Sequence, residues 1–195
     1  MRNMSKSRLE AFTDAVIAIV MTILVLELHQ PTTDTLAGLV GIERKLFIYI
    51  VSFVMLAIYW NNHHHMFQVV HKIDGRVLWA NNFFIFTLTL VPFATAWVGD
   101  FIDSLVPQLT YGVMTLLANV AYLILTKELI RVNGKESTLS ELFQKYNKSY
   151  VTIFLNILGI TLGILIHPYF VLVVNIAILI MWIVPDRRIE KQYKE

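Results

Sequence analysis

The stretch RLEAFTDAVIAIVMTILVLEL, residues 8–28, decides the fold of this chain. It carries no charge between Ala15 and Leu26, and it is long enough to cross a bilayer as a helix, which takes about 20 mostly apolar residues. Asp14 lies inside it, where an ionised carboxylate costs about 2.5–3.5 kcal/mol on insertion scales. An acid kept in such a segment usually has a partner and a function. The stretch therefore predicts a membrane span that carries a functional acid.

The composition of the whole chain is that of a membrane protein. Of its 195 residues, 56% are hydrophobic and 15% are charged, whereas soluble domains carry about 25% charged residues. The chain has no cysteine, which excludes disulfides, thiolate metal sites and thiol nucleophiles. The basic N-terminus resembles a signal peptide, but Asp14, Glu27 and the absence of a small-residue cleavage pattern favour a retained helix. We therefore expect an all-α, polytopic membrane protein.

We expect a single transmembrane domain, residues 1–195, with six helical spans. The spans are predicted at 8–28, 45–70, 77–98, 106–129, 149–166 and 169–184. His167-Pro168 predicts a tight turn between the last two spans, and Gly159-x-x-x-Gly163 is a close-packing motif that we expect to join helices within the subunit. A short amphipathic segment is predicted at 136–148 on the inner surface.

Basic residues predict the orientation, because they collect on the cytoplasmic side of membrane proteins. With both termini in the cytoplasm, only Arg44 and Lys45 of the 16 Lys and Arg residues fall on the outer side. The residues on the inner side are Arg2, Lys6, Arg8, Lys72, Arg76, Lys127, Arg131, Lys135, Lys145, Lys148, Arg187, Arg188, Lys191 and Lys194. This asymmetry also favours an even number of spans.

Polar residues within the spans are the candidates for function. They are Asp14, the run Trp60-Asn61-Asn62-His63-His64-His65, and the pair Asn81-Asn82. All lie toward the cytoplasmic side, so that a cluster of acid, imidazole and carboxamide at one depth can satisfy its own hydrogen bonds. Arg8 is the obvious charge partner of Asp14, but six residues place the two about 120° apart around a helix. A link between them must therefore run through other helices.

Three functions compete for the histidines: metal or haem ligands, a proton relay, and a structural network that ties the second span to Asp14. Zinc requires at least three converging ligands, and consecutive helical residues point about 100° apart. Histidine titrates near neutral pH, which suits a relay. We favour the structural network.

The first span also has an apolar stripe. Ile19, Ile23 and Leu26 recur at helical spacing with Thr22 beside them, and Asp14 lies about 140° from Ile19. The stripe is explained by core or lipid packing, or by a pore lining whose hydrophobic constrictions gate by dewetting.

Three patterns resemble the lysosomal potassium channel family of the transmembrane protein 175 type. Arg8-x-x-x-Phe12-Thr13-Asp14 is similar to the family's Arg-x-x-x-Phe-Ser-Asp signature on the first helix. Trp60-x-Asn62-His63-His64-x-x-Phe67 is similar to its second-helix pattern, and Asn81 or Asn82 leading to Pro92-Phe93 to its third. The resemblance covers roughly residues 8 to 93. Thr13 replaces the usual serine, and we expect its hydroxyl to keep the hydrogen bond.

The resemblance implies a homotetramer of one-repeat subunits whose first helices line the pore, without a Thr-Val-Gly-Tyr-Gly filter. The family's constriction maps onto Ile19, then Thr22 or Ile23, then Leu26; which of the middle two faces the axis stays open. Thr22 is the selectivity candidate, since four hydroxyls could replace part of the hydration shell of K⁺. The implied bracing network behind the pore helix is Arg8, Phe12, Thr13, Asp14, Trp60, Asn62, His63, His64 and Asn81.

We therefore expect a potassium-preferring cation channel of a prokaryotic inner membrane, conducting passively, with K⁺ only transiently in the pore. No enzyme activity, cofactor, structural metal or nucleic-acid partner is expected. Glu27 is either a cation-concentrating residue at the outer mouth or an ordinary interfacial residue. The alternative is a proton pathway or proton-coupled transporter that uses Asp14 and His63–His65. A third possibility is a membrane enzyme or haem carrier that uses the histidines.

Overall fold

The computed structural model describes residues 5–145 and 148–183, and every regular element in them is a helix. The helices are α1 (Lys6–Leu26), α2 (Leu36–Val40), α3 (Glu43–Gln68), α4 (Gly75–Thr89), α5 (Val91–Asp100), α6 (Leu105–Asn133), α7 (Thr138–Lys145), α8 (Lys148–Leu165) and α9 (Tyr169–Ile183). The expected all-α fold is confirmed. Val184, at the end of the last predicted span, lies outside the described residues, as do the basic residues Arg2, Arg187, Arg188, Lys191 and Lys194.

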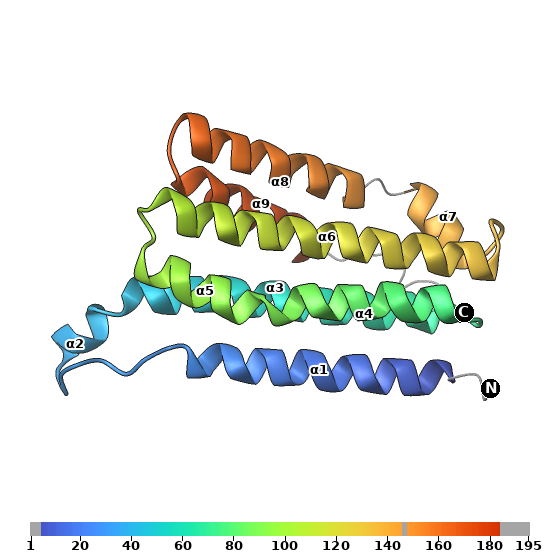
Figure 1. Cartoon of the computed structure of the whole chain (residues 1–195), viewed down its shortest axis with the longest axis horizontal. Coiled ribbons are helices and arrows are strands. Elements are labelled where there is room, and N and C mark those ends of the chain that lie inside the picture. Colours follow the sequence, from blue (N-terminus) through green and yellow to red (C-terminus); the bar gives the residue numbers. More distant parts are fainter. Residues whose placement is uncertain (1–4, 146–147, 184–195) are drawn as a thin grey trace.

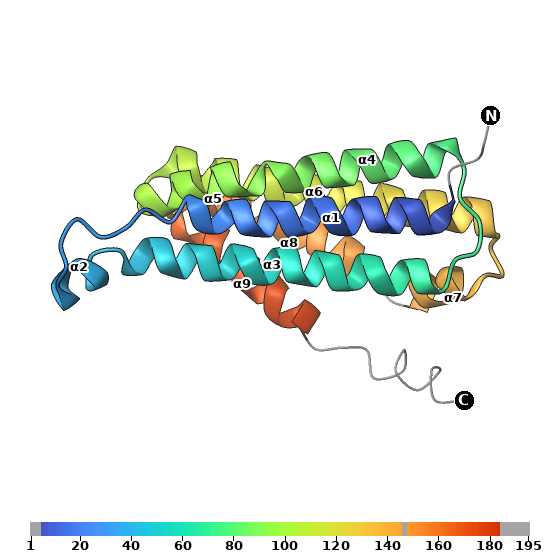
Figure 2. The same ribbon diagram turned by 90° about the horizontal axis from the view of Figure 1, so that it is seen from below.

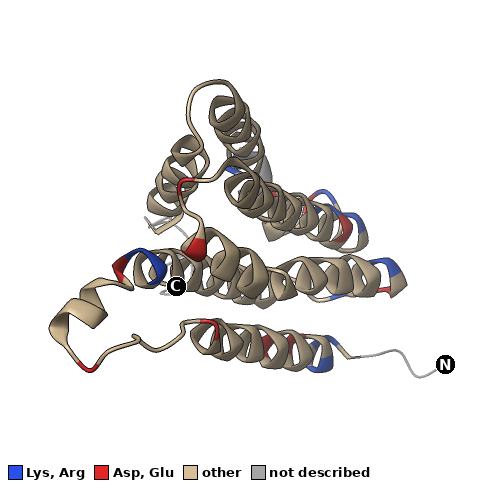
Figure 3. Cartoon of the chain, turned by 60° about the vertical axis from the view of Figure 1, so that its left-hand side comes forward, with Lys and Arg blue, Asp and Glu red and all other residues tan. Residues whose placement is uncertain are grey.

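Five segments of the described chain are long and apolar enough to cross a membrane. They are α1, α3, the α4–α5 pair taken together, α6 and α8, whereas α9 is a shorter apolar helix of 15 residues. Charged residues gather at the ends of the bundle, and acidic positions also occur along α1 (Figure 3). This distribution fits long helices that cross a bilayer and place their charged ends in water.

The predicted third span, 77–98, is divided into α4 and α5 at Leu90. The cause is Pro92, which has no backbone N–H and whose ring clashes with the carbonyl of Leu88, four residues earlier. Thr87 and Thr89 each donate a hydroxyl to the carbonyl three residues before them, which satisfies groups around the break. The predicted span 77–98 therefore consists of two helical segments rather than one continuous helix.

The helices form layers with α1 at one edge (Figures 1 and 2). α1 packs against α3, α4 and α5, and the α8–α9 hairpin packs against α6, with α9 also in contact with α3. Gly159 lies so close to α9 that an added Cβ would approach the Val174 Cβ to 2.9 Å, which confirms that the glycine motif joins helices within the subunit. α2 projects beyond the end of the bundle and was not predicted.

Ion pairs tie the loops at both ends of the bundle. At the end that carries α2, Asp103 accepts hydrogen bonds from the Tyr169 hydroxyl (2.5 Å) and Arg44 (2.9 Å), and these interactions lower the pKa of its carboxyl. At the other end, Asp74 accepts from Arg131 at 2.5 Å and from the N–H groups of Arg76 and Val77 at the start of α4. The Arg131 bond, followed by the capping N–H of Val77, holds the pKa of Asp74 below 3.8.

Candidate functional site

The candidate site is built on α1, which has one packed face and one open face. The packed face carries Leu9, Thr13, Ile17, Val20 and Leu24, all buried against α3, α4 and α5. Thr13 lies in the middle of this stripe. Nine residues separate Thr22 from Thr13, which is about 900°, or half a turn around the helix. Thr22 therefore lies directly opposite the packed face.

Around Thr22, the open face of the single subunit is apolar. Ile19 is 57% exposed and Leu26 is 75% exposed, and both flank Thr22. Ile23 is 40% exposed and lies on the side toward α5, where it lines a groove of about 500 Å³ with Pro92 and Phe93. Of the two residues left open by the sequence, Thr22 therefore lies on the centre of the open face and Ile23 on its flank.

The Thr22 hydroxyl has a defined polarity. It donates its hydrogen to the carbonyl of Ile19 at 2.7 Å, within its own helix. A hydroxyl has one hydrogen and two lone pairs. Because the hydrogen is used within the helix, the lone pairs are what Thr22 presents on the open face. That arrangement suits a cation and offers nothing to an anion.

Behind this face, three buried side chains connect α1 with α3 and α4. The Thr13 hydroxyl donates to the carbonyl of Leu9, so it can only accept from Asn81, whose Nδ2 lies 2.8 Å away. This fixes the Asn81 amide with its oxygen toward His63, at 3.0 Å from Nε2. His63 must therefore carry its proton on Nε2. His63 is 1% exposed and stacks between Phe67 and Phe84.

A second connection lies at the edge of α1 and includes Asp14. The Trp60 indole N–H donates to the Asp14 carboxylate at 3.0 Å. Trp60 stacks on His64, whose Nε2 lies 2.7 Å from the Gln68 amide nitrogen. Asp14 is half-buried, and this chain is exposed, in contrast to the Thr13–Asn81–His63 chain. The two connections involve different faces of α3.

Three residues of the expected bracing network lie elsewhere. Arg8 is exposed, and among the described residues it forms no ion pair with Asp14 or any other acid. Phe12 is half-exposed. Asn62 points away from α1: it donates to the carbonyl of Ile58 and lines a pocket with Tyr122. Asn62 lies one position from His63 in sequence, and consecutive helical residues point about 100° apart.

Glu27 caps the C-terminal end of α1. It is half-buried and lines both the groove beside Ile23 and a small cleft with Lys45 and Asp100, which form an ion pair. Glu27 itself forms no ion pair within the described part of the chain. Nor do three His, Asp or Glu side chains converge there as a metal site would require.

Sequence reasoning missed a polar chain on the far side of α3. The Tyr59 hydroxyl donates to Asn119, Asn119 donates to Asn156, and Asn156 contacts Asn175 at 3.4 Å. These residues connect α3, α6, α8 and α9. The signal was available, because single carboxamides inside apolar spans usually hydrogen-bond across helices.

The chain was also compared with known proteins. The sequence profile of the family described as "Endosomal/lysosomal potassium channel TMEM175" matches residues 8–92. A protein of Chryseobacterium sp. (strain P1-3), named a potassium channel, is 42% identical over 98% of this chain and 100% of its own length. A mouse protein named an endosomal/lysosomal proton channel is 27% identical over 51% of this chain and 21% of its own length.

The fold has a solved counterpart. A crystal structure of a "lysosomal potassium-selective channel TMEM175 homolog" from Chamaesiphon minutus superimposes with a TM-score of 0.81. The match covers 91% of this chain and 95% of that one, at 22% sequence identity. It therefore establishes a shared fold.

Proposed function

Because this chain belongs to the family of the endosomal/lysosomal potassium channel TMEM175, we propose that it forms a potassium-preferring cation channel. It is a multi-pass membrane protein, and its bacterial relatives are named potassium channels, which confirms the expectation that it is not an enzyme. The proposed location is a bacterial inner membrane, with both termini in the cytoplasm.

The observation that carries the proposal is the open face of α1. Among the described helices of one subunit none packs on this face, yet it holds a hydroxyl whose lone pairs point outward. Four copies arranged with these faces toward a common axis would place Thr22 in a ring with Ile19 and Leu26 on either side of it. The resemblance to one-repeat family members supports a homotetramer.

Each residue of the proposed pore lining has a physical role. Ile19 and Leu26 form apolar constrictions, which gate by dewetting. The four Thr22 hydroxyls replace part of the hydration shell of a dehydrating cation, as carbonyl oxygens do in other potassium channels. Glu27 lies at the outer end of α1, where its charge would raise the local concentration of cations.

The bracing network supports this arrangement from behind. Thr13 is half a turn from Thr22, so the buried Thr13–Asn81–His63 chain fixes the rotation that points Thr22 outward. Asp14 and Trp60 hold the edge of the same helix. His64, which stacks on Trp60, extends this edge of the proposed support.

The test is bilayer recording of the purified protein under bi-ionic K⁺/Na⁺ conditions. Thr22→Val should lower the potassium over sodium permeability ratio, while Thr22→Ser should retain it. Thr161→Val is a matched control, because Thr161 is exposed on α8 and its hydroxyl bonds only to its own helix. An unaltered reversal potential in Thr22→Val would remove Thr22 from the selectivity site.

A proton pathway is the second candidate, because mammalian relatives are named proton channels. Asp14 is the half-buried acid that would carry it, with His63–His65. The geometry weighs against a relay through these groups, since His63 bonds to Asn81 rather than to Asp14. A reversal potential that follows a pH gradient in potassium-free solution, and loses that response in Asp14→Asn, would favour this candidate.

A further inference from the structure

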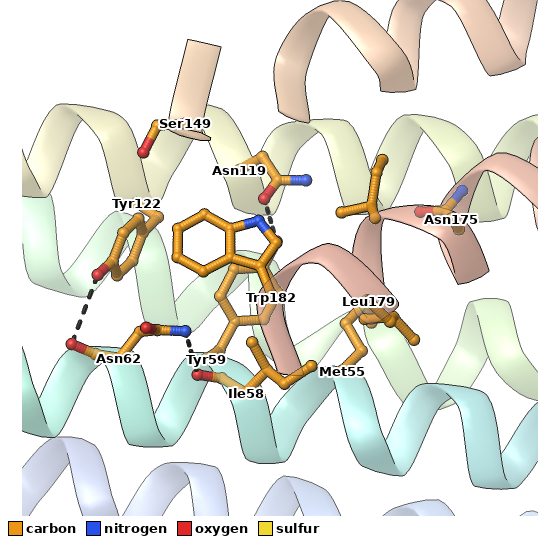
Figure 4. Close-up of a pocket in the computed structure, with 11 residues that line it drawn as sticks. Met55, Ile58, Tyr59, Asn62, Asn119, Tyr122, Ser149, Asn175, Leu179 and Trp182 are labelled. Carbon is orange, nitrogen blue, oxygen red and sulfur yellow. Dashed lines mark hydrogen bonds between the residues drawn. The ribbon is translucent and has the colours of Figure 1, made fainter. Parts of the chain in front are cut away.

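Two exposed carboxamides in the membrane-spanning helices are not used within the subunit. Asn61 on α3 and Asn82 on α4 are both exposed, and among the described residues neither side chain forms a hydrogen bond. Their neighbours in sequence differ: Asn81 bonds to His63, and Asn62 points into the pocket beside Tyr122 (Figure 4). Polar side chains inside a membrane almost always pair with other groups, usually across a contact between helices. The exposed carboxamides therefore indicate a contact outside the subunit.

The two exposed carboxamides lie at the same depth. Asn61 is seven residues before the end of α3, and Asn82 is seven residues after the start of α4. A short loop joins those two helix ends, so at 1.5 Å per residue each carboxamide lies about 10 Å from the same end of the bundle. The bond between His63 and Asn81 agrees with this register, because it joins α3 and α4 within two residues of both positions.

The carboxamides also lie on opposite flanks of α1, which runs between α3 and α4 in Figure 2. On α3, Trp60 bonds to Asp14 at one edge of α1, and Asn61 follows it on the exposed side of the helix. On α4, Asn82 lies about 20° around the helix from Thr89, which lines the groove at the other edge of α1. A contact between these flanks must therefore join two subunits head to tail, and such a contact forms a ring if the rotation closes.

The apolar parts of the two flanks fit the same register. Phe53 on α3 is 39% exposed and lies eight residues before Asn61, about 12 Å farther from that end of the bundle. On the other flank, Thr89 and Phe93 line the groove of about 500 Å³ beside α1, about 10 and 16 Å beyond Asn82. A single register therefore brings Asn61 to Asn82 and Phe53 to the groove of a neighbouring copy.

We propose that the α3 flank of one subunit docks on the α4–α5 flank of a second copy of this chain. Asn61 forms a hydrogen bond with Asn82 of the second copy, and Phe53 enters the groove of the second copy. Lipid tails would fill the groove but would leave both carboxamides without hydrogen bonds. The groove borders the open face of α1, so the docking brings the Thr22 faces of successive copies to one side. The inference rests on the proposed homotetramer and adds which surfaces meet in it.

The test is cysteine cross-linking, for which the chain is suited because it has no cysteine. Asn61→Cys combined with Asn82→Cys, oxidised as the purified full-length protein in detergent, should give a ladder of disulfide-linked species that stops at the tetramer. A disulfide requires Cα atoms within about 7 Å, so each single variant should stay monomeric on the same non-reducing gel. Asn61→Cys with Phe154→Cys is the matched control, because Phe154 is 65% exposed on α8, away from both flanks.

A second measurement tests the hydrogen bond itself. Asn61→Leu and Asn82→Leu should each weaken the association of subunits about threefold per contact, the factor for an average hydrogen bond between membrane helices. The double variant should lose no more than either single variant, because both remove the same bond. Losses that add in the double variant would overturn the assignment of Asn82 as the group that Asn61 meets.

The cross-linking outcomes separate this interface from the pore. A cross-link in either single variant would indicate a symmetric contact between like faces, and no ladder in the double variant would leave lipid on both flanks; each result would overturn the proposal. No ladder from a protein that still conducts K⁺ selectively would refute the interface alone. A full ladder with an unaltered reversal potential in Thr22→Val would instead refute the role of Thr22 and leave the interface standing.

Discussion

Replacement of Thr13 by valine tests whether the buried chain behind α1 holds the pore helix. The change keeps the shape of the side chain and removes one hydroxyl. Asn81, which is fully buried, then loses the acceptor of its Nδ2 group at 2.8 Å. An orphaned buried donor costs about 1–3 kcal/mol, while hydrogen bonds between membrane helices reach about 1.7 kcal/mol at most. We therefore expect Thr13→Val to destabilise the protein by about 1–2 kcal/mol, or roughly tenfold in the folded-to-unfolded ratio.

The chain offers a matched control in Thr115→Val. Thr115 is also buried, and its hydroxyl bonds only to the carbonyl of Gly112 in its own helix. Both variants lose a hydroxyl that donates to a carbonyl of its own helix. The difference between their unfolding free energies therefore isolates the bond to Asn81. Thr13→Ser should keep the bond to Asn81 and lie close to the wild type.

Denaturation in mixed micelles with increasing dodecyl sulfate gives the unfolding free energies of the wild type and the three variants. If Thr13→Val and Thr115→Val lose the same unfolding free energy within about 0.5 kcal/mol, the scatter usual for independent sites, the bond between the helices contributes nothing to stability and the bracing argument fails. If Thr13→Val is destabilised but its single-channel open probability is unchanged, the chain supports folding without setting the rotation of α1.

Three other predictions concern the pore, its edge and a loop. Ile19→Asn should change single-channel conductance by wetting the constriction, and an unchanged conductance would remove Ile19 from the pore. Asp14→Asn weakens the bond from Trp60 and should lower the tetramer fraction or open probability while the reversal potential stays constant; a normal tetramer with normal gating would contradict this role. The pKa of Asp74 lies below its ordinary 3.8. Its ion pair therefore contributes fully to the free energy of unfolding above pH 3.8, and this contribution is lost as pH falls through the lowered pKa. Asp74→Asn keeps the helix cap but should lack this pH-dependent stabilisation, which for an exposed ion pair is below about 1 kcal/mol. Identical acid-unfolding curves for Asp74→Asn and the wild type would refute this prediction.

The sequence predicted the spans because their length and hydropathy are properties of single segments. The break at Leu90 was also readable, since Pro92 cannot continue the hydrogen-bond ladder. α2 was not predicted, because a five-residue helix with exposed apolar residues has no periodic signal of its own.

The candidate site was only partly readable. Helical spacing placed Thr22 and Asp14 on different faces of α1, but not which face would pack. His63 and Asn62 are neighbours in sequence, yet one points to Asn81 and the other to the pocket beside Tyr122. Deciding between them requires the positions of α4 and α6, which only the tertiary structure supplies. Whether Thr22, Ile19 and Leu26 face a pore remains a prediction.

The internal hydrogen bond of Thr22 also bears on ion charge. Chloride is held in proteins by N–H and O–H donors, and the Thr22 hydrogen is already engaged by the Ile19 carbonyl. A ring of such hydroxyls would have no donor to offer a halide without breaking four bonds within the helices. Anion exclusion would then be a property of the helix backbone at this position, and it would not require a charged side chain in the proposed pathway.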